Sequence, residues 1–281
     1  MIRKSLFLCV AAVAATVSAQ SLRLDVSLEC DSYVLNEAVT LSLDVTPLGV
    51  APFIVDDYGD YKQNTLSIIL RHEGEGFIDP FRADPPFGTV MASPGRAEKL
   101  TCKLNDWFPL FRQGRYTVQV VARRGSESVA SPLVSFQIVK GLEISSTVRI
   151  LPDQERKARR YTLLYWPRQQ REELFLRVED VAEGNVVALF RLGRVMRVEP
   201  PRLEFGANGR VTVVHQVARD RFVRTVLLSD AENLDVVEQK QLVDPNQSTL
   251  ARSLLETRAR EREGASSEGG FRRRERGNSD K

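Results

Sequence analysis

Residues 39–45 read Val-Thr-Leu-Ser-Leu-Asp-Val, so apolar and polar side chains alternate strictly along this stretch. Successive side chains of a β-strand point to opposite faces, and this period of two therefore predicts a half-buried antiparallel strand. The same alternation recurs at residues 22–28, 66–70, 116–120 and 134–138, with turn-forming residues between the stretches. About seven short strands in about 120 residues predict a Greek-key β-sandwich over residues 20–140.

Three motifs in this region carry a family resemblance. Tyr33-Val34-Leu35-Asn36-Glu37 precedes the strand at 39–45, Trp107-Phe108-Pro109-Leu110 leads into Gly114-Arg115-Tyr116, and Ser131-Pro132 opens the last strand. In this order they resemble the immunoglobulin-like domains of secreted bacterial proteins, in which a glycine-x-tyrosine turn opens the penultimate strand. The resemblance covers residues 21–140 and implies a binding, spacer or scaffold module, although a fold alone assigns no function.

One segment departs from that family. Residues 73–99 are longer than the connection that such domains often have between the same strands. Long insertions between strands are either functional loops or mobile ones, so we expect a binding loop or a mobile loop here.

A second domain is expected over residues 141–244. Arg160-Tyr161-Thr162-Leu163 parallels Arg210-Val211-Thr212-Val213, which indicates a diverged internal repeat of about 50 residues. Each copy predicts four strands, and two four-stranded sheets packed face to face would cover each other's apolar sides. This half also resembles uncharacterised repeat-like β domains of secreted bacterial proteins, which implies no activity. Chance similarity between β segments remains the alternative to a true repeat.

The two ends of the chain differ from the domains. Arg3 and Lys4 precede an apolar run at residues 6–17, and Val17-Ser18-Ala19 provides small residues before a cleavage point. This pattern predicts a secretory signal peptide over residues 1–19, too short to anchor in a bilayer. Residues 245–281 predict a short helix ending near Arg262, followed by a disordered charged tail.

Composition excludes several function classes. Lys and Arg number 40 against 37 Asp and Glu, which gives a formal net charge of +3. So small an excess argues against a nucleic-acid-binding face. Beyond the leader no apolar run reaches the length of a membrane span, so we expect no membrane span.

The cysteines suggest one cross-link. Cys9 lies in the predicted leader, which leaves Cys30 and Cys102 in an oxidising compartment. A disulfide between them would close a loop of about 70 residues and stabilise the fold by about 4 kcal/mol. Two separate buried thiols are the alternative.

Catalytic patterns are missing from the sequence. It contains two histidines, His72 and His215, and neither stands in a recognisable nucleophile or zinc-ligand spacing. We place His215 on the half-exposed face of a strand. We therefore predict no catalytic residue, no cofactor and no enzyme activity. Carboxylates such as Asp79 and Asp84 leave a glycoside hydrolase open, because separation in space is invisible in the sequence.

Asp56, Asp57 and Asp60 surround a glycine turn and form the densest acidic group. Oxygen ligands so arranged suit calcium, although the twelve-residue loop pattern is missing. A solvated turn is the alternative.

Tyr161, Tyr165, Trp166 and Arg168 concentrate aromatic and basic side chains. Such a strip suits stacking against a sugar ring or a peptide. Packing inside the second domain is the alternative.

These observations predict an all-β, exported, non-enzymatic binding or scaffold protein. We expect it to be secreted or periplasmic, with attachment at the cell surface as a further option. Its partner would be an unidentified protein or glycan of the cell envelope. The alternatives are an envelope polysaccharide hydrolase or its accessory module, and a protease inhibitor that uses residues 73–99 as an exposed loop. The sequence predicts neither the ligand nor the oligomeric state.

Overall fold

The computed structural model describes residues 21–56, 64–151, 154–168, 171–206, 209–229 and 234–243. The described chain consists of β-strands and connections with one short 3-10 helix, η2 (Leu104–Asp106). It divides between Lys140 and Gly141 into two compact units, called the N-domain and the C-domain below. The all-β prediction is confirmed. The predicted leader, the C-terminal helix and the tail lie outside the described residues.

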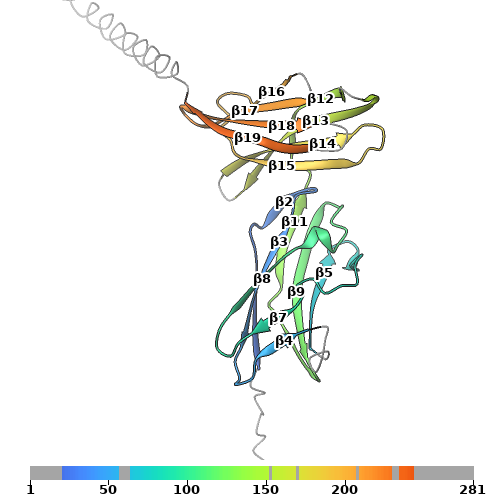
Figure 1. Ribbon diagram of the computed structural model, residues 1–281, viewed down its shortest axis with the longest axis vertical. Helices are drawn as coiled ribbons and strands as arrows, with labels where there is room; N and C mark the ends of the chain where they lie inside the picture. Colours follow the sequence, from blue (N-terminus) through green and yellow to red (C-terminus); the bar gives the residue numbers. More distant parts are fainter. Residues whose placement is uncertain are drawn as a thin grey trace, which may run out of the picture. The chain divides into compact units, whose positions relative to one another are not determined.

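The N-domain is a sandwich of two principal sheets (Figure 1). The first sheet has the order β1-β3-β8, and its strands are β1 (Leu22–Leu28), β3 (Thr40–Pro47) and β8 (Glu98–Lys103). The second has the order β2-β11-β9-β5-β6, with strands β2 (Ser32–Val34), β11 (Val134–Val139), β9 (Gly114–Arg124), β5 (Asn64–His72) and β6 (Gly76–Ile78). A further strand, β10 (Glu127–Ala130), also pairs with β9. Apart from β2, which runs parallel to β11, the order corresponds to the two sheets of an immunoglobulin-type sandwich.

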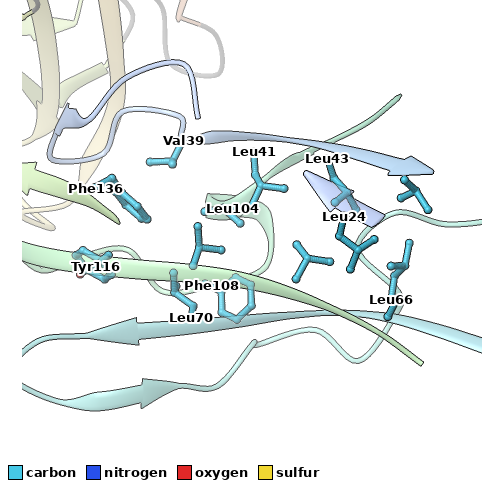
Figure 2. Close-up of a cluster of buried hydrophobic side chains, with 14 of the residues drawn as sticks. Leu24, Val39, Leu41, Leu43, Leu66, Leu70, Leu104, Phe108, Tyr116 and Phe136 are labelled. Atoms are coloured by element: carbon cyan, nitrogen blue, oxygen red, sulfur yellow. The ribbon is translucent and has the colours of Figure 1, made fainter. Parts of the chain in front are cut away.

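The predicted alternation builds the core between these sheets. Leu41 and Leu43 of β3 are completely buried, and the intervening residues of the strand are more exposed. Figure 2 shows both side chains on the side of β3 that faces Leu70 and Phe108. Burying one such side chain stabilises the fold by about 1.5–3 kcal/mol, so the alternation fixes which face of each strand points inward.

The insertion at residues 73–99 is tied to the sandwich at both ends. Its first part forms β6, which pairs with β5 at Leu70–His72. Its last part contains β7 (Val90–Ala92), which pairs with β4 (Phe53–Val55) in a small separate sheet. The residues between β6 and β7 therefore pass along the sandwich with both flanks held by backbone hydrogen bonds.

The C-domain contains two four-stranded antiparallel sheets in sequential order. The first sheet comprises β12 (Leu142–Leu151), β13 (Gln154–Arg168), β14 (Arg171–Asp180) and β15 (Val186–Arg194). The second comprises β16 (Arg202–Phe205), β17 (Arg210–Ala218), β18 (Arg221–Ser229) and β19 (Leu234–Val243). The prediction of two four-stranded units is confirmed, and the two similar motifs begin in β13 and β17, each the second strand of its sheet. One core joins the sheets, with Leu163 and Leu176 from the first and Val213 and Leu227 from the second.

Candidate functional site

The N-domain contains a cavity of about 610 Å³ beside β5. Among the described residues, four parts line it: the start of β5 at residues 64–68, the inserted segment at 80–86, the pair Trp107 and Phe108, and residues 55–56 at and just after the end of β4. Ligand pockets in proteins commonly measure about 300–1,000 Å³, so this cavity has the volume of a binding site.

The floor of the cavity belongs to the hydrophobic core. Leu66 and Phe108 line the cavity and are only 5% and 3% exposed. The turn at η2 fixes Phe108, whose backbone N–H donates a hydrogen bond of 2.8 Å to the Leu104 carbonyl oxygen. The Asn105 side chain in turn accepts a hydrogen bond from the Val39 N–H at 2.7 Å. The floor is therefore held by packing and by hydrogen bonds to the first sheet.

The inserted segment forms one wall, and contacts with Trp107 hold it there. The Phe81 N–H donates a hydrogen bond of 2.9 Å to the Trp107 carbonyl oxygen. The guanidinium carbon of Arg82 lies 5.0 Å from the centroid of the Trp107 ring, a cation–π distance. Arg82 also pairs with Asp84 at 3.5 Å. This wall carries one positive and one negative side chain beside three prolines, Pro80, Pro85 and Pro86.

The start of β5 brings a backbone edge to the cavity. β6 pairs with β5 only at Leu70, Arg71 and His72, so no described strand forms ladder hydrogen bonds with residues 64–69 on that side. The nearby strand β4 pairs with β7, and its contact with this part of β5 includes a hydrogen bond from the Asn64 side chain to the Ile54 carbonyl oxygen. Alternate residues of an edge strand direct their backbone N–H and C=O groups away from the neighbouring strand. Residues 64–68 line the cavity, so this edge offers hydrogen-bonding groups to an occupant.

The structure describes three of the five carboxylates that the sequence singled out, Asp56, Asp79 and Asp84. Asp56 and Asp84 both line the cavity, whereas Asp79 is exposed and lies outside the lining. Asp57 and Asp60 of the predicted calcium group lie outside the described residues. Within the described parts, no group of three or more His, Cys, Asp or Glu side chains is placed to hold a metal ion.

The predicted aromatic strip does not form a surface. Tyr161 and Tyr165 are buried in the core between the two C-domain sheets. Trp166, the next residue on the strand, alternates to the opposite face from Tyr165, and Arg168, which shares that other face, is itself buried. The alternative of internal packing is therefore the one observed for the tyrosines. Strand alternation, applied to residues 161–168, would have separated these side chains.

The two histidines belong to different units. His72 ends β5. Its ring centroid lies 4.8 Å from that of Tyr116 with the two rings tilted at 58°, and its Nε2 lies 3.1 Å from the Gln113 carbonyl oxygen. His215 on β17 is 1% exposed, so the prediction of a half-exposed strand face is wrong. Its position repeats that of Val211 and Val213 along the strand, and all three point into the sheet-to-sheet interior. Burial lowers the pKa of His215 to about 4.

Cys30 and Cys102 are both buried thiols, and no disulfide joins them in the structure. Cys102 lies on β8 and Cys30 follows β1, and β3 lies between these strands in the sheet. Two strand spacings amount to about 9.5 Å, whereas bridged cysteines have Cα atoms no more than about 7 Å apart. Burial raises the pKa of the Cys102 thiol to about 11, which makes it a poor nucleophile.

Trp107 and the prolines of the inserted segment are site residues that periodicity and motif spacing do not predict. A usable signal was present for the prolines, because Pro80, Pro85 and Pro86 cannot serve as interior strand residues. Trp107 belongs to a different connection, which follows β8 and η2. Their convergence depends on the pairing of β4 with β7, which periodicity alone does not predict.

Within the described residues, no helix has the length and apolar character that crossing a bilayer requires.

Comparisons with known proteins add little. No protein-family model matches the chain, and no curated protein matches it. Among solved structures, it is similar to the crystal structure of Spo0M, a sporulation control protein from Bacillus subtilis. The two chains are 9% identical, and the alignment covers 85% of this chain and 98% of that chain with a TM-score of 0.30. A similarity this low carries no argument about fold or function.

Proposed function

We propose that the chain is an exported, non-enzymatic binding protein whose N-domain holds an extended segment of another envelope protein in the cavity beside β5. The single observation that carries this proposal is the backbone edge of residues 64–68 along the cavity. An extended peptide that joins an exposed sheet edge gains main-chain hydrogen bonds, and neighbouring pockets select its side chains. Export rests on the signal-peptide pattern at residues 1–19.

The walls support a peptide occupant. Trp107, Phe108 and the three prolines offer apolar surface for side chains that leave the added strand on one face. Arg82 and Asp84 offer opposite charges at the same wall. Apolar surface with a few placed polar groups is the usual composition of a site that combines affinity with selectivity.

Selection from a phage-displayed library of random dodecapeptides tests the proposal on the mature chain. Selected peptides should bind, and N-methylation of every second backbone amide should abolish binding in only one of the two alternating patterns. That asymmetry is expected because only one edge of an added strand faces β5. Trp107→Ala should weaken binding at least about tenfold, the effect of losing roughly 1.4 kcal/mol of contact. Trp166→Ala in the C-domain is the matched control and should leave the affinity unchanged.

Two outcomes would contradict the peptide proposal. One is equal loss of binding for both N-methylation patterns, which would exclude a strand added to an edge. The other is a set of envelope glycans that bind with dependence on Trp107 when no peptide does, which would assign the cavity to sugars.

A polysaccharide hydrolase is the second candidate, and one observation favours it. Asp56 and Asp84 line the same cavity, as a pair of catalytic carboxylates would. This candidate predicts turnover of an envelope glycan that is lost in Asp84→Asn and in Asp56→Asn. Binding of the same glycan without turnover would exclude it.

The protease-inhibitor alternative remains a prediction for the inserted segment. Phe81 is 57% exposed and could enter a protease subsite. Inhibition of a protease that disappears in Phe81→Ala would support it. A point substitution is preferable to deleting residues 74–98, because that deletion also removes β6 and β7.

A further inference from the structure

Two arginines stand directly opposite each other in the first C-domain sheet. Arg149 of β12 is the register partner of Arg159 of β13. Like charges at directly opposed positions destabilise a sheet, and such pairs usually have carboxylate partners. Among the described residues neither arginine forms an ion pair: Arg149 contacts the Phe205 ring and Arg159 bonds to Ser229. On the other side of Arg159 lies Asp180, but its Oδ1 accepts hydrogen bonds from the Ala182 and Glu183 N–H groups of its own turn.

Arg159 is buried although it carries a charge. Arg159 is only 3% exposed, and its Nη1 donates a hydrogen bond of 2.7 Å to the Ser229 Oγ of the opposite sheet. The Tyr161 hydroxyl lies 2.6 Å from the same Oγ. The Nε of Arg159 is buried and meets no acceptor within the described chain. Burying a guanidinium without a paired anion costs folding free energy, so a bound anion at this cluster would be stabilising.

A cavity of about 210 Å³ adjoins this cluster. Tyr161 and Ser229 line it from within, and Arg149 lines it from the edge strand β12. The guanidinium of Arg149 lies 4.7 Å from the centroid of the Phe205 ring, which holds its charge beside the opening. A water molecule takes about 30 Å³ in the liquid, so the cavity has room for a tetrahedral oxyanion with several waters.

We propose that this cavity is a binding site for a phosphate or sulfate group, either a free ion or the end of a larger envelope molecule. Arg149 binds the oxyanion from the rim, and Arg159 supplies positive charge behind the base. One hydroxyl proton of the Tyr161–Ser229 pair joins these two side chains, and the other is donated to the oxyanion at the base. Arginine suits this role because its planar, permanently charged guanidinium matches oxyanion geometry. The site lies entirely within the C-domain and does not depend on the function proposed for the N-domain.

Titration calorimetry of the full mature chain with inorganic phosphate, and with sulfate, tests the proposal. Sodium chloride at matched ionic strength corrects for general screening. Arg149→Gln, on the edge strand, should lower the affinity at least about tenfold, because it removes a charge-assisted contact. Arg160→Gln is the matched control: Arg160 is next to Arg159, points to the other face of β13, pairs with Glu179 at 3.9 Å, and should leave the affinity unchanged.

Glucose 6-phosphate and glucosamine 6-sulfate distinguish the two sources of the group. If the esters bind as tightly as the inorganic ions, the ligand of the cavity is the terminal group of a larger molecule. If only the inorganic ions bind, the ligand is a free ion. The proposal is overturned if neither ion nor ester binds at millimolar concentration. It is equally overturned if Arg149→Gln binds phosphate as tightly as the unaltered chain, because the ion would then occupy another place.

Discussion

The hydroxyl group of Tyr116 donates a hydrogen bond of 2.8 Å to the carbonyl oxygen of Arg112, four residues earlier in the chain. Tyr116 lies near the start of β9 and is only 1% exposed. Its ring stacks on that of Phe136, with the ring centroids 5.3 Å apart. This bond fixes the corner through which the chain enters β9, the tyrosine corner of immunoglobulin-type sandwiches. Arg112 lies four residues after Phe108, so the same bond also helps to hold Trp107 and Phe108 in the lining of the proposed site.

Tyr116→Phe should lower the free energy of unfolding of the N-domain by about 1 kcal/mol, because the ring contacts remain and only the hydrogen bond is lost. Urea unfolding followed by Trp107 fluorescence measures this, in a Trp166→Phe background that leaves one tryptophan. Arg112→Ala keeps the carbonyl oxygen and removes only an exposed pairing with Glu75, so this control should change little. Equal losses in the two variants would contradict a role for the corner bond.

Stability of the C-domain should fall in mild acid through His215. Its pKa is about 4 in the folded chain against 6.5 for the ordinary group. The unfolded chain therefore binds the proton first, and the contribution of His215 is complete above pH 6.5 and lost as the pH falls toward 4. The loss amounts to about 3 kcal/mol at its largest.

The difference in unfolding free energy between the unaltered chain and His215→Gln, followed through Trp166 in a Trp107→Phe background, should shrink as the pH falls. His72→Gln in the N-domain is the control and should leave the pH profile of the C-domain unchanged. A difference for His215→Gln that stays constant from neutral pH to pH 4 would show that the buried imidazole is not the titrating group.

Gly209 should tolerate no side chain. Its φ is +70°, and a Cβ there would lie 2.1 Å from the Ser229 carbonyl oxygen. Gly184 has a nearly identical φ of +69° with nothing within 4 Å of its ideal Cβ. Gly184→Ala should therefore cost only about 1–2 kcal/mol, from the left-handed backbone alone. Gly209→Ala should cost a further 1–3 kcal/mol, roughly, because backbone atoms must move apart.

Thermal and urea unfolding of both variants measures the two costs. Similar losses of unfolding free energy for Gly209→Ala and Gly184→Ala would contradict this prediction, because the contact between Gly209 and Ser229 would then not oppose an added side chain. Ser229 also serves the proposed oxyanion site, so Gly209→Ala should weaken phosphate binding as well, whereas Gly184→Ala should not.

Alternation of apolar residues was enough to predict the all-β fold and the two four-stranded sheets. Val39, Leu41 and Leu43 repeat every second residue, and a strand of that pattern has one buried face wherever it lies in the sandwich. The similarity of residues 160–163 to 210–213 likewise identified the second strand of each C-domain sheet. The period of two in the sequence predicts which residues of a strand are buried, and each of these strands has one buried face.

The sequence does not predict which distant strands pair with each other. Cys30 and Cys102 were suitable for a disulfide by compartment and number, but the strand β3 between them is a matter of sheet order. Tyr161 and Tyr165 were grouped with Trp166 by closeness along the chain, although alternation turns Trp166 to the opposite face. The β5 cavity and the opposed pair Arg149 and Arg159 depend on register, which no single stretch of sequence reveals.

Hydrogen exchange at residues 64–68 tests the central claim most directly. The account predicts that backbone amides on the outer edge of β5 exchange rapidly in the unoccupied protein and become protected when a peptide selected by the N-domain saturates the cavity. The amides of β5 that bond to β9 should already be slow and should change little. Saturating peptide that leaves the edge amides of residues 64–68 unprotected would contradict the proposal that the occupant is added as a strand beside β5.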